Sequence, residues 1–246
     1  MKPIHLSVVI PAYNESHRIT PTIRSVAAYL SAQNYEAEIL VVLNNCTDDT
    51  LAIVTALEAE ISMLRHMDIG MIQSPSGTKG LAVRSGMLAA TGEYRIYMDA
   101  DNAAQIEEIE KLWPYMQSGY DVVFGSRYVA QSKLHVSWYR RLLSRAGNLA
   151  VQALLLPGVR DTQCAFKLFT ARATREIFSR MHIGGWGFDM EALFLAKRLS
   201  FCIREVAIQW KEIDGSSVKP KAFVTALEDL VRIRVWAWMG KYSDLK

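Results

Sequence analysis

The chain of 246 residues has the length of one large domain, or of one and a half. Although 50% of the residues are apolar, no stretch is long enough to span a bilayer, and no signal peptide precedes the first predicted strand. The three cysteines are scattered, which argues against a disulfide framework and against a metal site built from cysteines. The net charge of +3 is too small to indicate nucleic-acid binding. We expect a cytoplasmic protein.

The first part of the chain alternates between predicted strands and predicted helices. The apolar patterns and turn signals predict strands at 6–10, 38–43, 67–73 and 94–98, and helices at 16–33, 48–65 and 79–90. Such alternation favours an α/β fold with right-handed crossovers and a mostly parallel central sheet flanked by helices. In these sheets, ligands bind beyond the carboxyl ends of the strands. Asn14, Asn44 and Asp99 each follow a strand at that edge.

The pattern is less regular in the second part. We expect a helix at 105–117, a strand at 121–124, helices at 171–180 and 189–199, a strand at 202–210 and an amphipathic helix at 221–238. No repeat or linker divides the chain, so we expect a single domain spanning residues 1–246. Its expected parts are a nucleotide-binding half (1–101), an acceptor-binding half (102–220) and a C-terminal helix (221–246).

Two aspartates one residue apart follow the fourth predicted strand. Asp99 and Asp101 flank Ala100 directly after Met98. Mg²⁺ and Mn²⁺ prefer oxygen ligands, and Mg²⁺ usually leaves its other positions to water and substrate phosphates. The same pair also occurs in ordinary turns and helix caps. Its place at the ligand-binding edge of a predicted nucleotide-binding fold favours a metal site.

The loop after the first predicted strand carries groups suited to a nucleotide. Pro11 cannot donate a hydrogen bond to the sheet, so it ends the strand and opens the loop. Tyr13 offers a ring face, and Glu15 offers an acceptor for ribose hydroxyls; Asn14 lies between them. Without its neighbours this stretch also fits a simple turn with a helix cap.

Two further loops precede predicted helices. After the second strand, Asn44 can read the edge of a base, whereas Thr47 or Asp48 is suited to cap the next helix. In residues 77–80 (G-T-K-G), backbone N–H groups and Lys79 can meet a phosphate at a helix N-terminus. The loop is neither a Walker A motif nor the G-x-G-x-x-G of dinucleotide folds.

A basic segment without acidic residues runs from 122 to 160. Its arginines alternate with large apolar residues, and Arg127, Arg141 and Arg145 are our candidates for binding an acceptor phosphate, because the guanidinium fork matches phosphate oxygens. A solvated basic face is the simpler alternative for such a segment. Basic helices with a large apolar share are also typical of surfaces that face anionic lipid. The helix at 221–238 has the same character, and it suits either packing on the core or lying on a membrane.

Taken in order, these motifs resemble the inverting family 2 glycosyltransferases, which have the GT-A (nucleotide-diphospho-sugar transferase) fold. The resemblance is carried by residues 11–15 (P-A-Y-N-E), 47–50 (T-D-D-T), 79–86 (K-G-L-A-V-R-S-G) and 99–101 (D-A-D). In the second half, residues 125–127, 160–169 (R-D-T-Q-C-A-F-K-L-F) and 186–191 (W-G-F-D-M-E) resemble the polyprenyl-phosphate branch. Within that branch, the pattern is most similar to the dolichyl-phosphate glucosyltransferases and next to the dolichyl-phosphate mannosyltransferases.

The resemblance implies the inverting transfer of a hexose from a nucleotide diphosphate sugar to dolichyl or undecaprenyl phosphate. It favours glucose and a UDP-sugar, with Mg²⁺ or Mn²⁺ held by Asp101 and Asp99. A lipid phosphate is already anionic, so no strong general base is needed. The partner would be a membrane surface, with the protein peripheral on its cytoplasmic face.

Site residues also follow from the resemblance. It implies catalytic roles for Asp101, Arg127 and Asp189, and contacts to phosphates for Gln163 and Lys167. Asp189 is suited to hold a sugar hydroxyl or to cap the helix that it opens; Glu191, on the same helix, is also suited to sugar hydroxyls.

The chain departs from the family pattern at two places. Asn44 and Asn45 stand where the family usually has an acidic pair, and an amide both donates and accepts, which leaves the base open. Ala165 replaces a usual glycine. Two alternatives stay open: a GDP-mannose-dependent polyprenyl-phosphate mannosyltransferase, and a transferase of the same fold that acts on a soluble or glycan acceptor.

Overall fold

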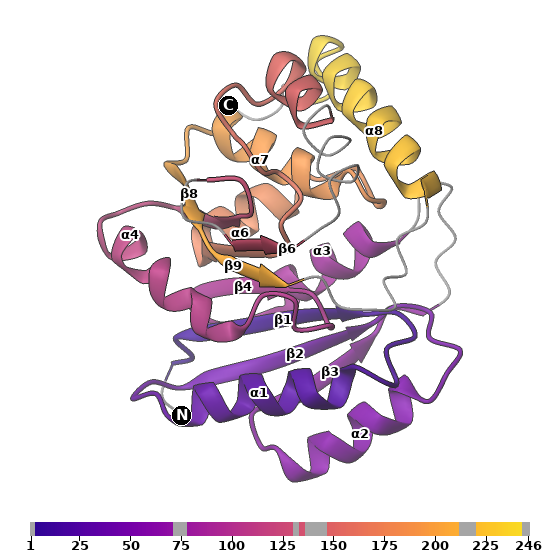
Figure 1. Ribbon diagram of the computed structural model, residues 1–246, viewed down its shortest axis with the longest axis vertical. Helices are drawn as coiled ribbons and strands as arrows, with labels where there is room; N and C mark the ends of the chain where they lie inside the picture. The colour runs from indigo at the N-terminus through magenta and orange to yellow at the C-terminus, as the bar shows by residue number, and fades with distance from the viewer. Residues whose placement is uncertain (1–2, 71–77, 130–132, 136–146, 212–219, 243–246) are drawn as a thin grey trace.

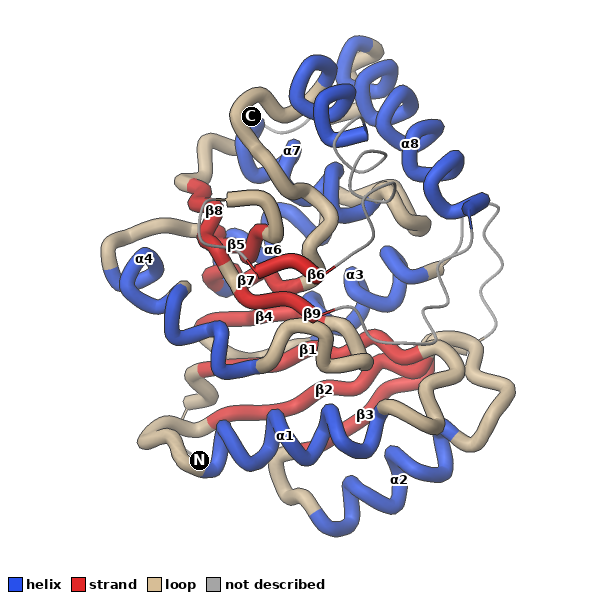
Figure 2. Tube along the Cα trace, viewed as in Figure 1, coloured by secondary structure: helices blue, strands red, loops and turns tan. Residues whose placement is uncertain are grey.

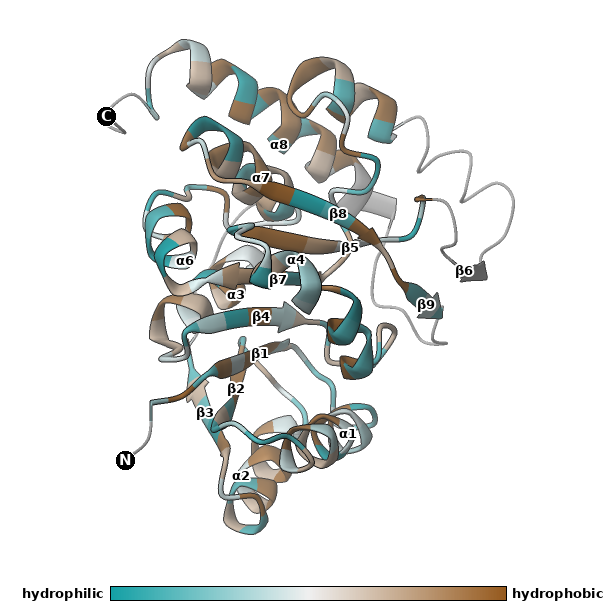
Figure 3. Ribbon diagram, turned by 90° about the vertical axis from the view of Figure 1, so that its left-hand side faces the viewer, coloured by the Kyte–Doolittle hydropathy of each residue, from teal (hydrophilic) through white to brown (hydrophobic). Residues whose placement is uncertain are grey.

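The computed structural model describes residues 3–70, 78–129, 133–135, 147–211 and 220–242 (Figure 1). A seven-stranded sheet in the order β3-β2-β1-β4-β7-β5-β8 runs through the molecule, and Figure 3 shows it from β8 at the top to β3 at the bottom. Its strands are β1 (Leu6–Ala12), β2 (Ala37–Leu43), β3 (Leu64–Asp68), β4 (Tyr94–Met98), β5 (Val122–Ser126), β7 (Phe166–Thr170) and β8 (Ile203–Ala207).

All neighbouring strands of this sheet are parallel except β7, which is antiparallel to both β4 and β5. The sheet therefore joins the two predicted halves of the chain, because β4 belongs to the first half and β7 to the second. Two short parallel strands, β6 (Lys133–His135) and β9 (Gln209–Lys211), form a separate sheet.

Helices cover both faces of the sheet (Figure 2). The helices are α1 (Ile19–Ser31), α2 (Thr50–Glu60), α3 (Lys79–Ala89), the 3₁₀ helix η1 (Ile106–Lys111), α4 (Trp113–Gln117), α6 (Ala171–Phe178), α7 (Phe188–Arg198) and α8 (Pro220–Trp238), and residues 147–154 are also helical. Helices α1, α2 and η1 pack on one face of the sheet, and α3, α6, α7 and α8 on the other.

The alternation of side chains along each strand builds two apolar layers. Val8 and Ile10 point into the layer beneath α1, whereas Val9 between them points into the layer beneath α3 and α7. On β4, Ile96 and Met98 join the first layer and Tyr97 joins the second. Burying a valine, leucine or isoleucine completely contributes about 1.5–3 kcal/mol. The two layers fix the register of the sheet, because a slip by one residue would exchange them.

The structure confirms the predicted α/β class with a mostly parallel sheet, and it corrects several elements. Helix α2 ends at Glu60 and not at residue 65, because Ile61 takes an extended backbone, and β3 begins at Leu64, which pairs with Ile39. The predicted strand at 202–210 is divided into β8 and β9, and the predicted helix at 105–117 into η1 and α4. Strand β7 was not predicted.

The C-terminal helix forms where its pattern predicted it. Ala226, Leu230 and Ile233 are buried against the second layer, so one face of α8 packs on the core. Val231 and Val235 are exposed on the other face. Within the described part of the chain, no helix combines the length and the apolar character needed to cross a membrane.

Candidate active site

The loops at the carboxyl ends of β1, β2 and β4 contain three asparagines in the left-handed region. Asn14, Asn45 and Asn102 have φ values of 53°, 57° and 57°. This conformation is uncommon outside glycine, and asparagine is among the residues that tolerate it best. Such backbone conformations cluster at functional sites. Three of them at one edge of the sheet single out the edge where the sequence predicted nucleotide binding.

The loops after β1 and β2 are joined by hydrogen bonds. The Oδ1 atom of Asn14 accepts the N–H of Thr47 at 2.8 Å. Asp48 accepts the N–H of Ser16 at 3.1 Å and that of Thr50, the first residue of α2, at 3.0 Å. Burial opposes ionisation of Asp48, but these hydrogen bonds outweigh it and lower its pKa to about 2. The N-cap of α2 is Asp49 and not the predicted Thr47 or Asp48, although Asp48 binds the first N–H of the helix. These hydrogen bonds hold the two loops together as one surface.

The structure brings Asp99, Asp101 and Lys79 together at the end of β4. The Nζ atom of Lys79, at the start of α3, lies 2.6 Å from Oδ1 of Asp99. Asp101 accepts the N–H of Ala103 at 3.0 Å. Burial and the neighbouring Asp99 carboxylate raise the pKa of Asp101. The predicted metal ligands and the predicted phosphate-binding lysine therefore belong to one cluster.

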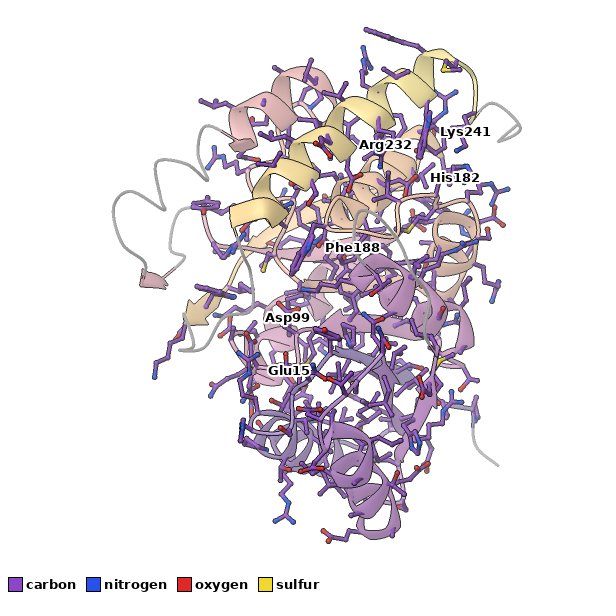
Figure 4. The ribbon with its side chains drawn as sticks, turned by 90° about the vertical axis from the view of Figure 1, so that its right-hand side faces the viewer. Glu15, Asp99, His182, Phe188, Arg232 and Lys241 are labelled. Carbon is purple, nitrogen blue, oxygen red and sulfur yellow. The ribbon has the colours of Figure 1, made fainter. Side chains whose placement is uncertain are left out.

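Glu15 lies beside this cluster, as Figure 4 shows for Glu15 and Asp99. Its carboxylate is bound by the Arg18 guanidinium at 2.7 and 2.9 Å. Burial raises the pKa of Glu15, and the negative charges of Asp101 and Asp99 raise it further. Arg18 lowers this pKa, but by less than the other effects raise it. Tyr13 is 52% exposed in the same loop, so its ring is free to stack against a base, whereas Asn44 is buried.

The donor set at the end of β4 fits a hard divalent cation. Two carboxylates are enough for Mg²⁺ or Mn²⁺ when substrate phosphates complete the coordination. Among the residues that the structure describes, no group of three or more histidine, cysteine, aspartate or glutamate side chains forms a metal cage. Asp99 and Asp101 would hold the ion, with a diphosphate as the third ligand.

Asp189 has other neighbours than the sequence predicted. It does not cap α7, whose N-cap is Gly187. Its Oδ1 atom accepts the Tyr97 hydroxyl at 2.5 Å and is also bound by the Lys167 ammonium. Lys167 is fully buried and donates a further hydrogen bond to the Cys164 carbonyl at 2.6 Å. The ammonium group of Lys167 is therefore used by Asp189 inside the fold, and it does not face solvent, where we expected it to meet a phosphate.

Glu191 is a structural residue in α7. Its carboxylate accepts the N–H groups of His182 and Ile183 at 3.0 and 2.8 Å and the Tyr242 hydroxyl at 2.6 Å. The expected contact of Glu191 with sugar hydroxyls is therefore not supported, because its oxygens are already used inside the fold.

Arg127 is paired with a buried aspartate that the sequence analysis did not single out. Its Nε and Nη2 atoms lie 2.8 and 3.0 Å from the two oxygens of Asp161, whose carboxylate also accepts the Arg127 N–H at 2.9 Å. Burial opposes ionisation of Asp161, but the Arg127 charge outweighs it and lowers the pKa of Asp161. The Arg127 guanidinium also lies 5.4 Å from the centre of the Trp210 ring.

A cavity of about 90 Å³ lies beside Arg127. Its polar lining includes Arg160, Thr162, Asn148 and the predicted Gln163, and its apolar lining comes from the helix at 147–154, from α7 and from α8 (Val151, Met190, Ala226, Leu227, Leu230). Arg141 and Arg145, the other predicted acceptor residues, lie outside the described residues. The cavity therefore combines charged and apolar walls next to Asp189, which precedes Met190.

Tyr97, Asp161 and the cavity residues of α8 were missed by sequence reasoning. One signal was available for Tyr97, because residues two apart on a strand share a face and Asp99 follows it at that spacing. For Asp161 the signal was its place in residues 160–169, the segment that resembles the polyprenyl-phosphate branch. The α8 residues gave no such signal, since their contact with the cavity depends on tertiary packing.

The fold and this site define a class of protein. A mostly parallel sheet interrupted by one antiparallel strand and flanked by helices is the fold of the nucleotide-diphospho-sugar transferases, the GT-A fold. The sequence matches the family model "Glycosyl transferase family 2" over residues 7–178, and the chain belongs to that family. It is a glycosyltransferase, as the resemblance implied.

The chain has curated relatives over nearly its whole length. It is 34% identical to the dolichyl-phosphate beta-glucosyltransferase of Dictyostelium discoideum, covering 96% of this chain and 76% of the relative. It is also 34% identical to the Saccharomyces cerevisiae enzyme of that name, with coverage of 99% and 78%, and 30% identical to the Homo sapiens enzyme, with coverage of 98% and 73%.

Solved structures of more distant proteins share the fold. Glucosyl-3-phosphoglycerate synthase from Mycobacterium tuberculosis, in complex with Mn²⁺ and UDP-glucose, has a TM-score of 0.70 at 16% identity, covering 94% of this chain and 79% of that chain. Staphylococcus aureus TarS (1–349), in complex with UDP-GlcNAc, has a TM-score of 0.57 at 18% identity, with coverage of 94% and 66%. At these identities the likeness shows the fold alone.

Proposed function

We propose that this enzyme transfers glucose, with inversion, from UDP-glucose to a polyprenyl phosphate such as dolichyl phosphate. The observation that carries the proposal is the cavity beside Arg127, whose lining changes from charged to apolar. Arg127 and Arg160 suit a phosphate, and Val151 and Leu230 suit the first isoprene units. The names of the relatives support the same acceptor and the same sugar.

The donor would bind at the loops after β1, β2 and β4, within residues 1–101. Tyr13 would stack on the base, and the buried Asn44 would face its edge. Asp99 and Asp101 would hold Mg²⁺ or Mn²⁺ on the diphosphate, and Lys79, 2.6 Å from Asp99, would add a positive charge there. The acceptor would bind within residues 102–220 together with α8.

The chemistry requires little from the protein beyond position and charge. An oxygen of the lipid phosphate attacks C1 of glucose opposite the UDP group, and the C1–oxygen bond to UDP breaks with its electron pair leaving on UDP. A phosphate monoester is anionic at neutral pH, so no residue has to remove a proton from it. When bound, the metal stabilises the negative charge that grows on UDP. Arg127 orients the phosphate, and Asp189 accepts a hydroxyl of the hexose.

We also propose that α8 rests on a membrane. Its exposed face carries apolar residues at helical spacing, namely Val224, Leu227, Val231, Val235 and Trp238, and the helix at 147–154 adds Leu149 and Leu154 beside it. Arg234 lies 5.0 Å from the Trp238 ring, a combination typical of a membrane interface with anionic lipid. Leu227 belongs both to this face and to the cavity, so a lipid tail leaving the cavity would meet the membrane directly.

Transfer of radioactive label into the organic phase tests the proposed function. The purified protein is incubated with Mn²⁺, dolichyl phosphate and labelled UDP-glucose or GDP-mannose. We expect label in lipid from UDP-glucose alone, and none with EDTA or in Asp101→Ala. Glu107→Ala is the matched control, because it removes an exposed carboxylate near the same sheet edge and should keep full activity.

Two results would overturn parts of the proposal. Labelling of the lipid from GDP-mannose would show that the donor carries mannose and guanine in place of the proposed glucose and uracil. Hydrolysis of UDP-glucose without labelling of the lipid would support the proposed donor site and reject the proposed lipid acceptor.

A further inference from the structure

We propose that Tyr97 and Lys167 are positioning residues that hold the Asp189 carboxylate in place for the donor hexose. The inference rests on the proposed function, in which Asp189 accepts a hydroxyl of the hexose. Neither residue touches a substrate: both act by fixing the orientation of one carboxylate.

The sheet register places the two donors side by side. Tyr97 on β4 is directly opposite Lys167 on the antiparallel β7, so both side chains leave the same face of the sheet. The first turn of α7 brings Asp189 over them. Tyr97 and Lys167 are fully buried, and Asp189 keeps 4% of its surface exposed.

Both donors bind the same oxygen of Asp189. Oδ1 accepts the Tyr97 hydroxyl at 2.5 Å and is paired with the Lys167 ammonium. Among the described residues, no group donates to Oδ2, and this atom is not fully enclosed. Charge-assisted bonds of this kind are about twice as strong as neutral ones. Asp189 is therefore fixed at one oxygen, with the other available to a ligand.

The available oxygen lies next to the donor site. Tyr97 is two residues before Asp99, which directly follows β4, and Lys79 links Asp99 to Trp186, whose ring centre is 5.3 Å from Nζ. Burial lowers the pKa of Lys79, but Asp99 raises it more, and Asp189 adds to the rise, so Asp189 lies within electrostatic reach of the proposed phosphate site. A hexose attached to a diphosphate at Asp99 would be within the same region.

Stability alone gives little reason to keep such a cluster. Burying an ion pair is costly, and apolar residues of similar volume are often as stable or more stable. The ring of Tyr97 already packs against Phe169 and Phe188, so its hydroxyl is not needed to fill the core. A carboxylate that must keep one orientation does need these two donors.

Kinetic comparison of single and double variants tests the inference. Tyr97→Phe keeps the ring and removes only the hydroxyl; we expect kcat for glucose transfer to fall about tenfold, equivalent to about 1.4 kcal/mol, while inhibition by UDP, which lacks the hexose, stays unchanged. In Asp189→Asn, adding Tyr97→Phe should lower kcat no further, because Tyr97 acts only through Asp189. Lys167→Met should lower kcat at least as much as Tyr97→Phe.

Tyr242→Phe is the matched control. It removes a buried hydroxyl that donates to Glu191 at 2.6 Å, on the same helix as Asp189. It should lower the Tm about as much as Tyr97→Phe and leave kcat unchanged. If Lys167→Met does not fold, Tyr97→Phe, alone and combined with Asp189→Asn, is sufficient to test the positioning role.

The positioning role is overturned if Tyr97→Phe keeps the wild-type kcat, or if its effect multiplies with that of Asp189→Asn. If the wild type transfers no glucose to dolichyl phosphate, the proposed function fails separately. The same variants are then compared in metal-dependent hydrolysis of the sugar nucleotide that the wild type turns over. Equal hydrolysis by Tyr97→Phe and the wild type would reject the positioning role there, and so would the absence of any such hydrolysis by the wild type.

Discussion

Glu38 is a buried carboxylate at the amino end of the sheet, away from the active site. It accepts the Ser7 hydroxyl at 2.6 Å, the Thr91 N–H at 2.7 Å and Nε of Arg65 at 2.7 Å. Burial opposes its ionisation, but these partners outweigh burial and hold the pKa of Glu38 below its usual value of 4.5. The group therefore joins β1, β2, β3 and the turn before β4 as an anion.

Glu38→Gln should destabilise the fold in a pH-dependent way. At pH 7 we expect the free energy of unfolding to fall by about 1–3 kcal/mol, because buried donors lose their charged acceptor. Since the folded pKa is lowered, this stabilisation is fully present above pH 4.5 and is lost as the pH falls through the folded pKa. Urea unfolding at pH 7 and at pH 3.5 measures the difference. A gap between the two proteins that does not shrink at low pH would contradict the assignment.

Asp161 fixes Arg127, and Asp161→Asn removes that charge with little change of shape. Breaking a buried pair costs about 3–5 kcal/mol, and we expect the lower end because the Arg127 side chain keeps 20% of its surface exposed. The KM for dolichyl phosphate should rise while the KM for UDP-glucose stays constant. Glu176→Gln, which breaks an exposed pair with Arg180, should cost at most about 1 kcal/mol and leave both KM values unchanged. An altered KM for UDP-glucose alone would assign Arg127 to the donor.

At the scale of elements, α8 connects the core, the cavity and the molecular surface. Asp229 of α8 accepts the N–H of Gly187 at 3.1 Å, which ties the helix to the start of α7. Just beyond its C-terminal end, the Tyr242 hydroxyl donates to Glu191, and Lys241 lies 3.6 Å from the ring centre of Trp236. Figure 4 shows His182 and Lys241 near Arg232 of this helix. A helix fixed at its middle and at its C-terminal end presents its exposed apolar face rigidly.

Val231→Glu tests what that face does. We expect it to reduce binding to vesicles with anionic lipid at least tenfold, because a charge replaces a 55% exposed valine at the proposed interface. Activity on detergent-dispersed dolichyl phosphate should stay the same, since Val231 does not line the cavity. Leu51→Glu on α2 is the control: that leucine is 44% exposed on the other side of the sheet and should not affect binding. Equal vesicle binding by Val231→Glu and the wild type would reject the membrane surface.

The sequence predicts the order of the elements better than the direction of each strand. The strand and loop order was sufficient to predict that Asn14, Asn44 and Asp99 lie at one edge, because parallel strands bring their carboxyl ends together. An apolar run, however, does not reveal the direction of its strand, so antiparallel β7 was missed. The contact of Asp189 with Tyr97 and Lys167 depends on that register, and no pattern within one segment encodes it.

At the scale of the whole molecule, the two proposed substrates meet where β4 and β7 adjoin. The carboxylate pair follows β4, and Lys167 on β7 holds Asp189 between that pair and the cavity. In the proposed function, donor contacts would come mainly from the first half of the chain and acceptor contacts from the second. The site is therefore complete only when both halves are folded together.

Ligand-linked stability measures this dependence in the intact protein. A ligand that binds only the folded state stabilises it by about 2.7 kcal/mol at 100 times its Kd, so UDP with Mn²⁺ should raise the Tm by several degrees. EDTA should abolish most of the rise, because the diphosphate would then face the Asp99 and Asp101 carboxylates without a cation between them. Asp101→Asn should behave like EDTA treatment, while Glu107→Ala should keep the full rise. The same increase in Tm with and without metal would show that Lys79 alone neutralises the diphosphate and would reject the metal site.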